Sequence, residues 1–442
     1  MAPNVLFILA DDLGYADLSC YGRKDYATPH LDALAKEGVR LTDGYSNSPV
    51  CSATRVSILT GEYQYRYPLG LHEPLVWGAS VTSDTPLERK KRFTPLPLDV
   101  RTLPRDFKKR GYSTHLVGKW HLGTLPHNGP RSYGYDTFFG FLGGATDYFQ
   151  HRMYLDKEVE SDGLVVDNQF VKREGYLTHL LGDEAEKIVG EKHKDPWMLS
   201  LHFNAPHWPW EAPDDRERSK DIDNLLALEG NIRKYGEIVK AMDDEIGRLV
   251  AKLKETGEFD NTIIVFTSDN GGERFSDNWP FIGVKTELLE GGLRVPLIVS
   301  WPRGLQIDGH TNQVMTSMDI YPTLLGLVDG RDEEYPGFDG ANLSSVFRGS
   351  AAIDRKLFWR YKSYDQEAVR DGRWKYLKIE DREYLFDLEF DERERTNEKN
   401  KHPQLFKKLK QEWADWNKNM LPYPVDLPSY HVKNRNDFAE KY

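Results

Sequence analysis

Short apolar runs, each followed by polar or turn residues, most strongly constrain the fold of this chain. They alternate with stretches in which apolar residues recur with a helical period. This alternation is typical of a mostly parallel sheet covered by helices on both faces, so we predict an α/β fold built on one large sheet. The predicted core strands cover residues 5–10, 113–118, 197–203, 263–268 and 295–300.

Two helices are predicted between these strands. Thr28 and Pro29 supply an N-cap and a first-turn residue for a helix that runs to about Lys36. Residues 234–254 predict a longer helix, because apolar side chains recur there at spacings of three or four and form one stripe that faces the sheet. The stripe consists of Ile238, Met242, Ile246, Leu249 and Leu253.

A change of pattern along the chain predicts two domains. The 442 residues exceed the roughly 250–300 at which a single core tends to split. After residue 348 the pattern changes, which predicts a large domain over residues 1–348 and a small antiparallel-sheet-plus-helix domain over 349–442. The small domain has strand-like runs at 357–361, 374–379 and 384–387 and a helix at 403–417. Residues 63–101 are rich in proline and charge and predict a long surface loop.

Composition argues against several classes of partner. The net charge of −11 argues against nucleic acid, whose binding needs clustered lysine and arginine. No apolar run approaches the roughly 20 residues of a membrane-spanning helix. With only Cys20 and Cys51, a disulfide framework beyond one bridge and a four-thiolate zinc site are excluded. The first strand begins almost at Met1, so we expect a cytoplasmic protein, or a periplasmic or secreted one if a signal peptide was removed.

Oxygen-donor side chains follow two of the predicted strands. Asp11 and Asp12 end the first strand, and Asp269 and Asn270 end the strand at 263–268. Open α/β sheets bind ligands at the carboxyl ends of their strands, so we expect these side chains to converge. Carboxylate and amide oxygens without histidine suit a hard cation such as Ca²⁺ or Mg²⁺ better than zinc. Each pair alone could equally form a turn or a helix cap.

Cys51 is expected where a loop enters a helix. Free backbone N–H groups and the positive end of the helix dipole favour an anion at such a position. Arg55 lies one turn later on the same face, where its guanidinium can hold an oxyanion. Taken alone, the same residues also fit a buried, inert cysteine.

Four motifs, taken together, resemble one known family. The first motif contains Cys51, Ala53 and Arg55 and is followed by Thr60-Gly61. It is similar to the Cys-x-(Pro or Ala)-x-Arg signature of the formylglycine sulfatases. Over about the first 340 residues the chain resembles the type I sulfatases of the alkaline phosphatase superfamily, which implies an alkaline-phosphatase-like fold. The companion motifs, in the family's order, are Gly118-Lys119-Trp120-His121, Asn204-Ala205-Pro206-His207 and Gly283-Val284-Lys285.

This resemblance implies a nucleophile made after translation. A formylglycine-generating or radical maturing enzyme oxidises the cysteine to an aldehyde, and the hydrate of that aldehyde attacks the sulfur of a sulfate ester. The implied catalytic residues are Cys51, Arg55, Lys119, His121, His207 and Lys285, with the two lysines and the arginine on the sulfate, His121 at the second hydroxyl and His207 at the leaving oxygen. One Ca²⁺ per chain, with Mg²⁺ as the alternative, is implied at Asp11, Asp12, Asp269, Asn270 and the modified Cys51.

The substrate is predicted only by class. A sulfated carbohydrate is favoured, and an aryl or alkyl sulfate is second. Position 53 is alanine, whereas many members of the family have proline there. The alanine form occurs mainly in bacteria, which favours a bacterial origin. The oligomeric state is left open. Side chains near the motifs that either stack on sugar rings or pack within loops are Trp208, Trp210, His151 and Arg152.

Three rival functions follow from the same residues. A phosphonate monoester or phosphodiester hydrolase of the same superfamily shares the formylglycine and one metal. A two-zinc phosphatase is disfavoured, because ligands for a second metal are not recognisable near the motifs. A non-catalytic protein that binds sulfated glycans is the rival from another class, and it requires that Cys51 stay unmodified.

Overall fold

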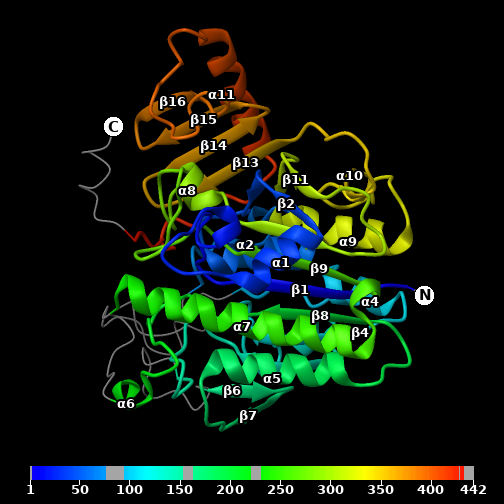
Figure 1. The fold of residues 1–442 in the computed structure, drawn as a ribbon. Coiled ribbons are helices and arrows are strands. Elements are labelled where there is room, and N and C mark those ends of the chain that lie inside the picture. Colours follow the sequence, from blue (N-terminus) through cyan, green and yellow to red (C-terminus); the bar gives the residue numbers. More distant parts are fainter. Residues whose placement is uncertain (1, 76–93, 153–162, 221–229, 428, 433–442) are drawn as a thin grey trace.

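A large mixed sheet forms the centre of the computed structural model, which describes residues 2–75, 94–152, 163–220, 230–427 and 429–432 (Figure 1). Its strands are β1 (Asn4–Ala10), β2 (Val39–Leu41), β4 (Ser113–Lys119), β5 (Thr137–Phe141), β6 (Leu164–Val166), β7 (Gln169–Val171), β8 (Trp197–His202), β9 (Thr262–Ser268), β10 (Leu297–Ser300) and β11 (Gly309–Thr311). Their order is β11-β2-β10-β9-β1-β8-β4-β5-β6-β7. The central strands β9, β1, β8, β4 and β5 are parallel, whereas β10 and β6 are antiparallel to their inner neighbours. The predicted α/β class with a mostly parallel sheet is confirmed.

The apolar sequence of β1 follows from its burial on both faces. All seven of its residues are buried, as expected for a central parallel strand. Alternate side chains enter two separate cores, with Phe7 in one and Ile8 in the other. The register pairs Ala10 with Ser268 of β9 and Leu9 with His202 of β8. The polar residues that follow these strands therefore leave the sheet at the same edge.

Helices cover both faces of the large sheet. The core that contains Ile8 is covered by α1 (Pro29–Glu37), α5 (Leu177–Gly190) and α7 (Ile232–Thr256), and Figure 1 shows α5 and α7 side by side. The opposite core is covered by α2 (Cys51–Thr60), α4 (Leu103–Lys108) and α9 (Ile320–Asp329). No helix within the described ranges is both long and apolar enough to cross a membrane. Shorter elements are β3 (Gly44–Tyr45), β12 (Met315–Thr316), α6 (Arg216–Ser219), α8 (Glu290–Leu293) and α10 (Ser344–Phe347).

The predicted small antiparallel sheet with one helix is also confirmed. Four consecutive strands form this sheet, and α11 (Pro403–Asn417) packs on it with the bounds that the sequence predicts. One strand, β14, was not predicted, because its sequence QEAVRD is mostly polar. The domain boundary at residue 348 stays a prediction. The strands are β13 (Lys356–Tyr361), β14 (Gln366–Asp371), β15 (Trp374–Ile379) and β16 (Arg382–Asp387).

The prediction of a surface loop over residues 63–101 is wrong for its first part. Tyr63 and Tyr65 are buried, and their rings lie 5.0 and 5.7 Å from that of Trp416 in α11. These aromatic residues show no strand or helix period, yet they are buried because the C-terminal helix packs over them. Residues 76–93 of the predicted loop lie outside the described residues.

Glu73 joins this segment to the C-terminal part of the chain. Its carboxylate accepts hydrogen bonds from the Tyr423 hydroxyl at 2.5 Å and the Lys362 backbone N–H at 2.9 Å. Its backbone oxygen accepts from the Tyr430 N–H at 3.0 Å. The side chain is fully enclosed, and burial raises its pKa to about 8.

Glu73→Gln should make the protein less sensitive to pH. Because folding raises this pKa, the contribution to stability is fully present below about pH 4.5 and is lost as the pH rises through about 8. Glutamine cannot ionise, so the variant should gain about 1–3 kcal/mol over the parent at pH 8.5 and little at pH 4.5. Urea unfolding at both pH values measures this. The exposed Glu174→Gln is the control, and an equal gain at both pH values would contradict the assignment.

Candidate active site

The candidate residues meet at the carboxyl edge of the large sheet. Asp11 follows β1, Lys119 ends β4, and Asp269 follows β9, as the strand register requires. The sequence predicted this convergence, and the structure brings together the implied catalytic and metal-ligating residues. His121 belongs to the group, because the charges of Lys119 and Arg55 act on its imidazole. All of them are buried.

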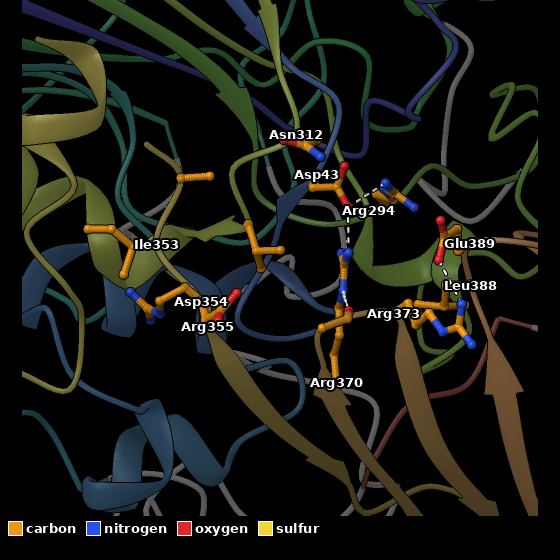
Figure 2. A pocket seen from close by; sticks show the side chains of 13 residues that line it. Asp43, Arg294, Asn312, Ile353, Asp354, Arg355, Arg370, Arg373, Leu388 and Glu389 are labelled. Atoms are coloured by element: carbon orange, nitrogen blue, oxygen red, sulfur yellow. Dashed lines mark hydrogen bonds and ion pairs between the residues drawn. The ribbon is translucent and has the colours of Figure 1, made fainter. Parts of the chain in front are cut away.

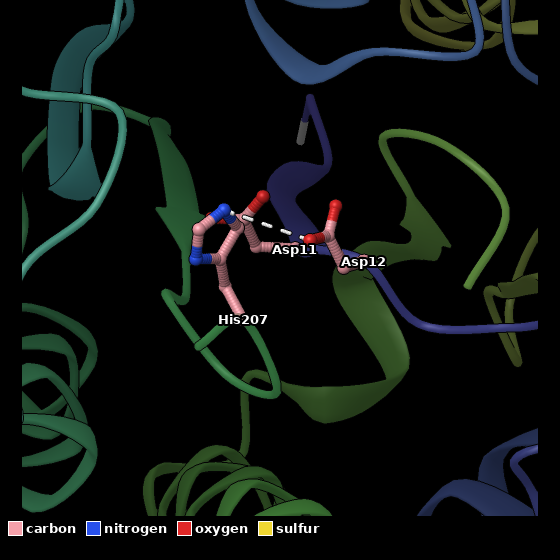
Figure 3. Close-up of side chains that lie close together, drawn as sticks. All are labelled: Asp11, Asp12 and His207. Carbon is pink, nitrogen blue, oxygen red and sulfur yellow. Dashed lines mark ion pairs between the residues drawn. The ribbon is translucent and has the colours of Figure 1, made fainter. Parts of the chain in front are cut away.

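An oxygen-rich cluster lies at the centre of this edge. Ligand atoms of Asp11, Cys51 and Asp269 lie within 4.8 Å of one another, and so do those of Asp11, Asp12 and His207 (Figure 3). Asp12 has a φ of 66°, an uncommon conformation that aspartate tolerates and that is frequent at functional sites.

The chemistry of this cluster fits a hard cation. Asp11 Oδ1 and Asn270 Oδ1 are buried and have no hydrogen-bond partner among the described residues. Burial and repulsion from Asp269 raise the pKa of Asp11 well above its ordinary value. A divalent cation would satisfy both oxygens and favour the charged carboxylate, and an oxygen donor set suits Ca²⁺ or Mg²⁺.

Each carboxylate of the cluster is paired with one basic group. Arg55 donates from Nε and Nη2 to Asp269 Oδ2, at 3.1 and 2.8 Å. Within these pairs the charges of carboxylate and basic group offset one another, so a divalent cation that favours the ionised carboxylates would add positive charge to the site. That charge favours an anionic substrate. The other pairs join Lys119 Nζ to Asp11 Oδ2 at 2.6 Å and Lys285 Nζ to Asp12 Oδ2 at 2.7 Å.

Cys51 is the first residue of α2, as expected. Val50 provides no side-chain cap, so the first N–H groups of the helix are open to an anion. The Cys51 side chain is buried, and burial raises the pKa of the thiol despite the nearby lysines. An unmodified Cys51 is therefore neutral and a poor nucleophile.

The two candidate histidines have defined hydrogen bonds. His121 Nε2 donates to the Leu75 carbonyl at 2.7 Å, which leaves Nδ1 unprotonated and without a partner in the described part of the chain. His207 Nδ1 donates to the Trp208 carbonyl at 2.6 Å, and its Nε2 lies 3.4 Å from Lys285 Nζ. Burial lowers the pKa of both imidazoles well below the ordinary value. Both rings are therefore neutral and can accept a proton.

Two residues of the site were missed by sequence reasoning. His202 ends β8, and its Nδ1 lies 3.2 Å from the Lys119 carbonyl and 3.4 Å from Arg55 Nη1. The only signal was a polar residue at the end of an apolar strand. Glu273 lies three residues after Asn270, with one oxygen 3.9 Å from Lys285 Nζ.

The four side chains considered for sugar stacking separate into two groups. Trp210 is buried and packs on Phe275 at 4.6 Å between ring centroids. His151 is buried with Nε2 at 3.1 Å from the Gly175 carbonyl. Both therefore pack within the protein. Trp208 is partly exposed and lies 4.6 Å from the ring of His207, while Arg152 is exposed.

A separate cavity of about 390 Å³ lies between the β14–β15 turn and the chain before β13 (Figure 2). It contains none of the candidate residues. Four arginines line it, but each pairs with a carboxylate, so the cavity has little free positive charge. Asp43 binds Arg294 and Arg370 at 2.8 and 2.6 Å, Arg355 binds Asp319 at 2.9 Å, and Arg373 binds Glu389 at 2.9 Å.

The fold and the site together define a hydrolase of charged esters with an alkaline-phosphatase-like architecture. A sulfatase family model matches residues 3–330. The chain belongs to the sulfatase family, whose members hydrolyse sulfate esters. This confirms the resemblance to type I sulfatases of the alkaline phosphatase superfamily.

Three relatives illustrate this membership. Arylsulfatase J of Mus musculus is 33% identical over 77% of this chain, which spans 55% of that protein. N-acetylgalactosamine-6-sulfatase of Rattus norvegicus is 30% identical over 84% of this chain and 71% of its own length. The solved structure of Ps i-CgsB has a TM-score of 0.81 and 30% identity, covering 99% of this chain and 96% of that one.

Calcium should stabilise the chelator-treated protein. It supplies a partner for the orphaned oxygens of Asp11 and Asn270 and relieves the repulsion between carboxylates. At a concentration of 100 Kd the gain should be about 2.7 kcal/mol, measured as a rise in the unfolding midpoint. Asp11→Asn should abolish most of this rise, and the exposed Asp415→Asn should keep it. A rise with zinc but not with Ca²⁺ or Mg²⁺ would contradict the assignment.

Proposed function

We propose that this protein removes sulfate from a sulfated carbohydrate, using one Ca²⁺ and a formylglycine made from Cys51. The proposal rests on the position of Cys51 relative to the buried carboxylates and to the start of α2. Its sulfur lies within 4.8 Å of ligand atoms of Asp11 and Asp269, at the open N-terminus of a buried helix. A side chain at that point can attack a sulfate group and lie beside a cation.

Conversion of Cys51 to formylglycine supplies a nucleophile that the thiol at this position cannot provide. The raised pKa of Cys51 keeps the thiol protonated at neutral pH. Hydrated formylglycine offers two hydroxyls on one carbon, so that one can attack sulfur while the other later allows the aldehyde to reform and release sulfate. A cation bound at this site would stabilise negative charge on the sulfate oxygens.

Basic side chains from three segments bind the sulfate group in this proposal. Arg55, Lys119 and Lys285 are buried and already fixed by their carboxylate partners. Because they need not reorganise when charge develops on the sulfate oxygens, they can stabilise the transition state.

The two histidines transfer protons at opposite stages of the reaction. Lys285 Nζ carries protons and lies 3.4 Å from the unprotonated Nε2 of His207, so Lys285 can protonate this nitrogen, which then passes the proton to the leaving oxygen. His121 has its Nδ1 lone pair free of any partner in the described ranges, and it accepts the proton from the second hydroxyl when sulfate is expelled.

A carbohydrate substrate is supported by the relatives. Ps i-CgsB has been solved in complex with k-i-k-neocarrahexaose, at 29% identity and a TM-score of 0.81 to this chain. The rat relative is named for an amino sugar sulfate. The partly exposed Trp208 beside His207 gives an apolar face on which a sugar ring can pack.

Cys51→Ser should stop multiple turnover. Serine has one hydroxyl, so it can take sulfate once but cannot release it by forming an aldehyde. Steady-state hydrolysis should fall by about 100-fold or more, with at most one equivalent released in a burst assay. Cys20→Ser, a change of the other cysteine, should keep full activity. Full steady-state turnover by Cys51→Ser would refute the mechanism.

A substrate panel separates this function from its rivals. Protein from a host with a maturing enzyme should react with a hydrazide probe at position 51 and hydrolyse sulfated mono- and oligosaccharides. Rates on a phosphodiester and a phosphonate monoester should be at least about 100-fold lower. Equal rates would favour the phosphonate or phosphodiester hydrolase, and sugar binding without an aldehyde or turnover would favour a binding protein.

A further inference from the structure

The C-terminal segment after α11 returns to the candidate active site. The Leu421 N–H donates to the Tyr65 carbonyl at 3.0 Å, which brings the chain back over the large domain. Further on, the Val432 N–H donates to Thr286 Oγ1 at 3.1 Å. Thr286 directly follows Lys285, so residues 429–432 lie next to a sulfate-binding lysine of the proposed mechanism.

The same segment also reaches the opposite side of the site. The Tyr430 N–H donates to the Glu73 carbonyl at 3.0 Å, and Ser429 forms an isolated bridge with Glu73. Two residues after Glu73, the Leu75 carbonyl holds His121 Nε2. The segment therefore connects the part of the chain that orients His121 with the loop that carries Lys285.

Tyr430 is the aromatic residue of this segment. Its side chain is 41% exposed, although its backbone is held on both sides. Apart from burial, the groups that act on its pKa are Glu273, Lys285 and Asp12. The Val432–Thr286 hydrogen bond places the segment of Tyr430 beside Lys285, and the exposed part of Tyr430 leaves its ring open to a ligand.

Glu273 supplies a polar group beside the same lysine. The residue is 8% exposed, and its Oε2 has no hydrogen-bond partner among the described residues. Lys285 Nζ lies 3.9 Å away, which is too far for a hydrogen bond. A buried carboxylate oxygen without a donor is unfavourable, so a ligand hydroxyl that donates to it would be bound well.

We propose that Glu273, Tyr430 and Trp208 form the subsite for the sugar ring that carries the sulfate. Trp208 and Tyr430 provide aromatic faces beside His207 and Lys285, and Glu273 accepts a hydrogen bond from a sugar hydroxyl. This combination of apolar faces and one placed acceptor is suited to carbohydrate. The inference rests on the proposed function for its choice of substrate class and adds residues that determine specificity.

Binding, rather than turnover, tests this subsite. The full chain is made without the maturing enzyme, so that Cys51 stays a thiol and the sugar sulfates are not hydrolysed. It is titrated by calorimetry with inorganic sulfate and with the 6-sulfates of galactose, N-acetylgalactosamine and glucosamine and galactose 4-sulfate. The best sugar sulfate should bind at least about 10-fold more tightly than inorganic sulfate, because the ring adds contacts. If none does so, the proposal is overturned.

The variants distinguish the subsite from a general role in folding. Tyr430→Ala and Glu273→Ala should each weaken binding of the best sugar sulfate by about 5- to 30-fold. Neither change should weaken binding of inorganic sulfate, because both residues contact the sugar and not the sulfate group. Glu273→Gln keeps an acceptor oxygen and should retain most of the affinity. Phe390→Ala, at an aromatic residue that is 79% exposed in the small domain, is the matched control.

Each result decides the question. An equal loss for sugar sulfate and inorganic sulfate, or no loss, overturns the subsite. If Tyr430→Ala lowers the unfolding midpoint, Tyr430→Phe is used, which keeps the ring and should bind within about threefold of the parent. Failure of the parent to hydrolyse any sulfate ester, with sugar binding intact, would refute the proposed function and leave the subsite standing.

Discussion

Three buried pairs between a carboxylate and a basic group hold the residues of the candidate active site in place. Each pair joins segments that are far apart in the sequence, so the site exists only when the large sheet is assembled. An unpaired charge in such a buried position would be strongly destabilising. Within each pair the two charges offset one another, so a cation that keeps the carboxylates ionised would add positive charge to the network. The pairs are Asp11 with Lys119, Asp12 with Lys285, and Asp269 with Arg55.

The sequence predicted those parts of the site that depend on strand ends and local motifs. Asp11 and Asp269 follow strands with apolar cores, and parallel strands bring such positions together without further information. His202 and Glu273 could not be predicted in this way, because their roles depend on contacts across the sheet. Similarly, Tyr65 has no periodic neighbours and is buried only by α11. The roles of all these residues in catalysis stay predictions.

The small sheet is physically connected to the reactive edge of the large one. Lys375 of β15 is completely buried and donates to Glu290 Oε1 at 2.8 Å. Glu290 begins the short helix α8, and the Gly292 carbonyl that follows accepts from the Gly271 N–H at 3.0 Å. The contact runs from the C-terminal sheet to the loop next to Asn270. Loss of the small sheet would thus disturb the geometry of the candidate site.

The burial of Cys51 determines whether this residue can be oxidised before or after the protein folds. Its side chain is 2% exposed, and every residue of α2 around it is buried. An oxidising enzyme could not reach the sulfur once the sheet and its helices have closed around it. If the residue is converted, the conversion must precede closure, so synthesis and folding compete with it in time. Molecules that fold first would have the same fold but would lack the aldehyde for good.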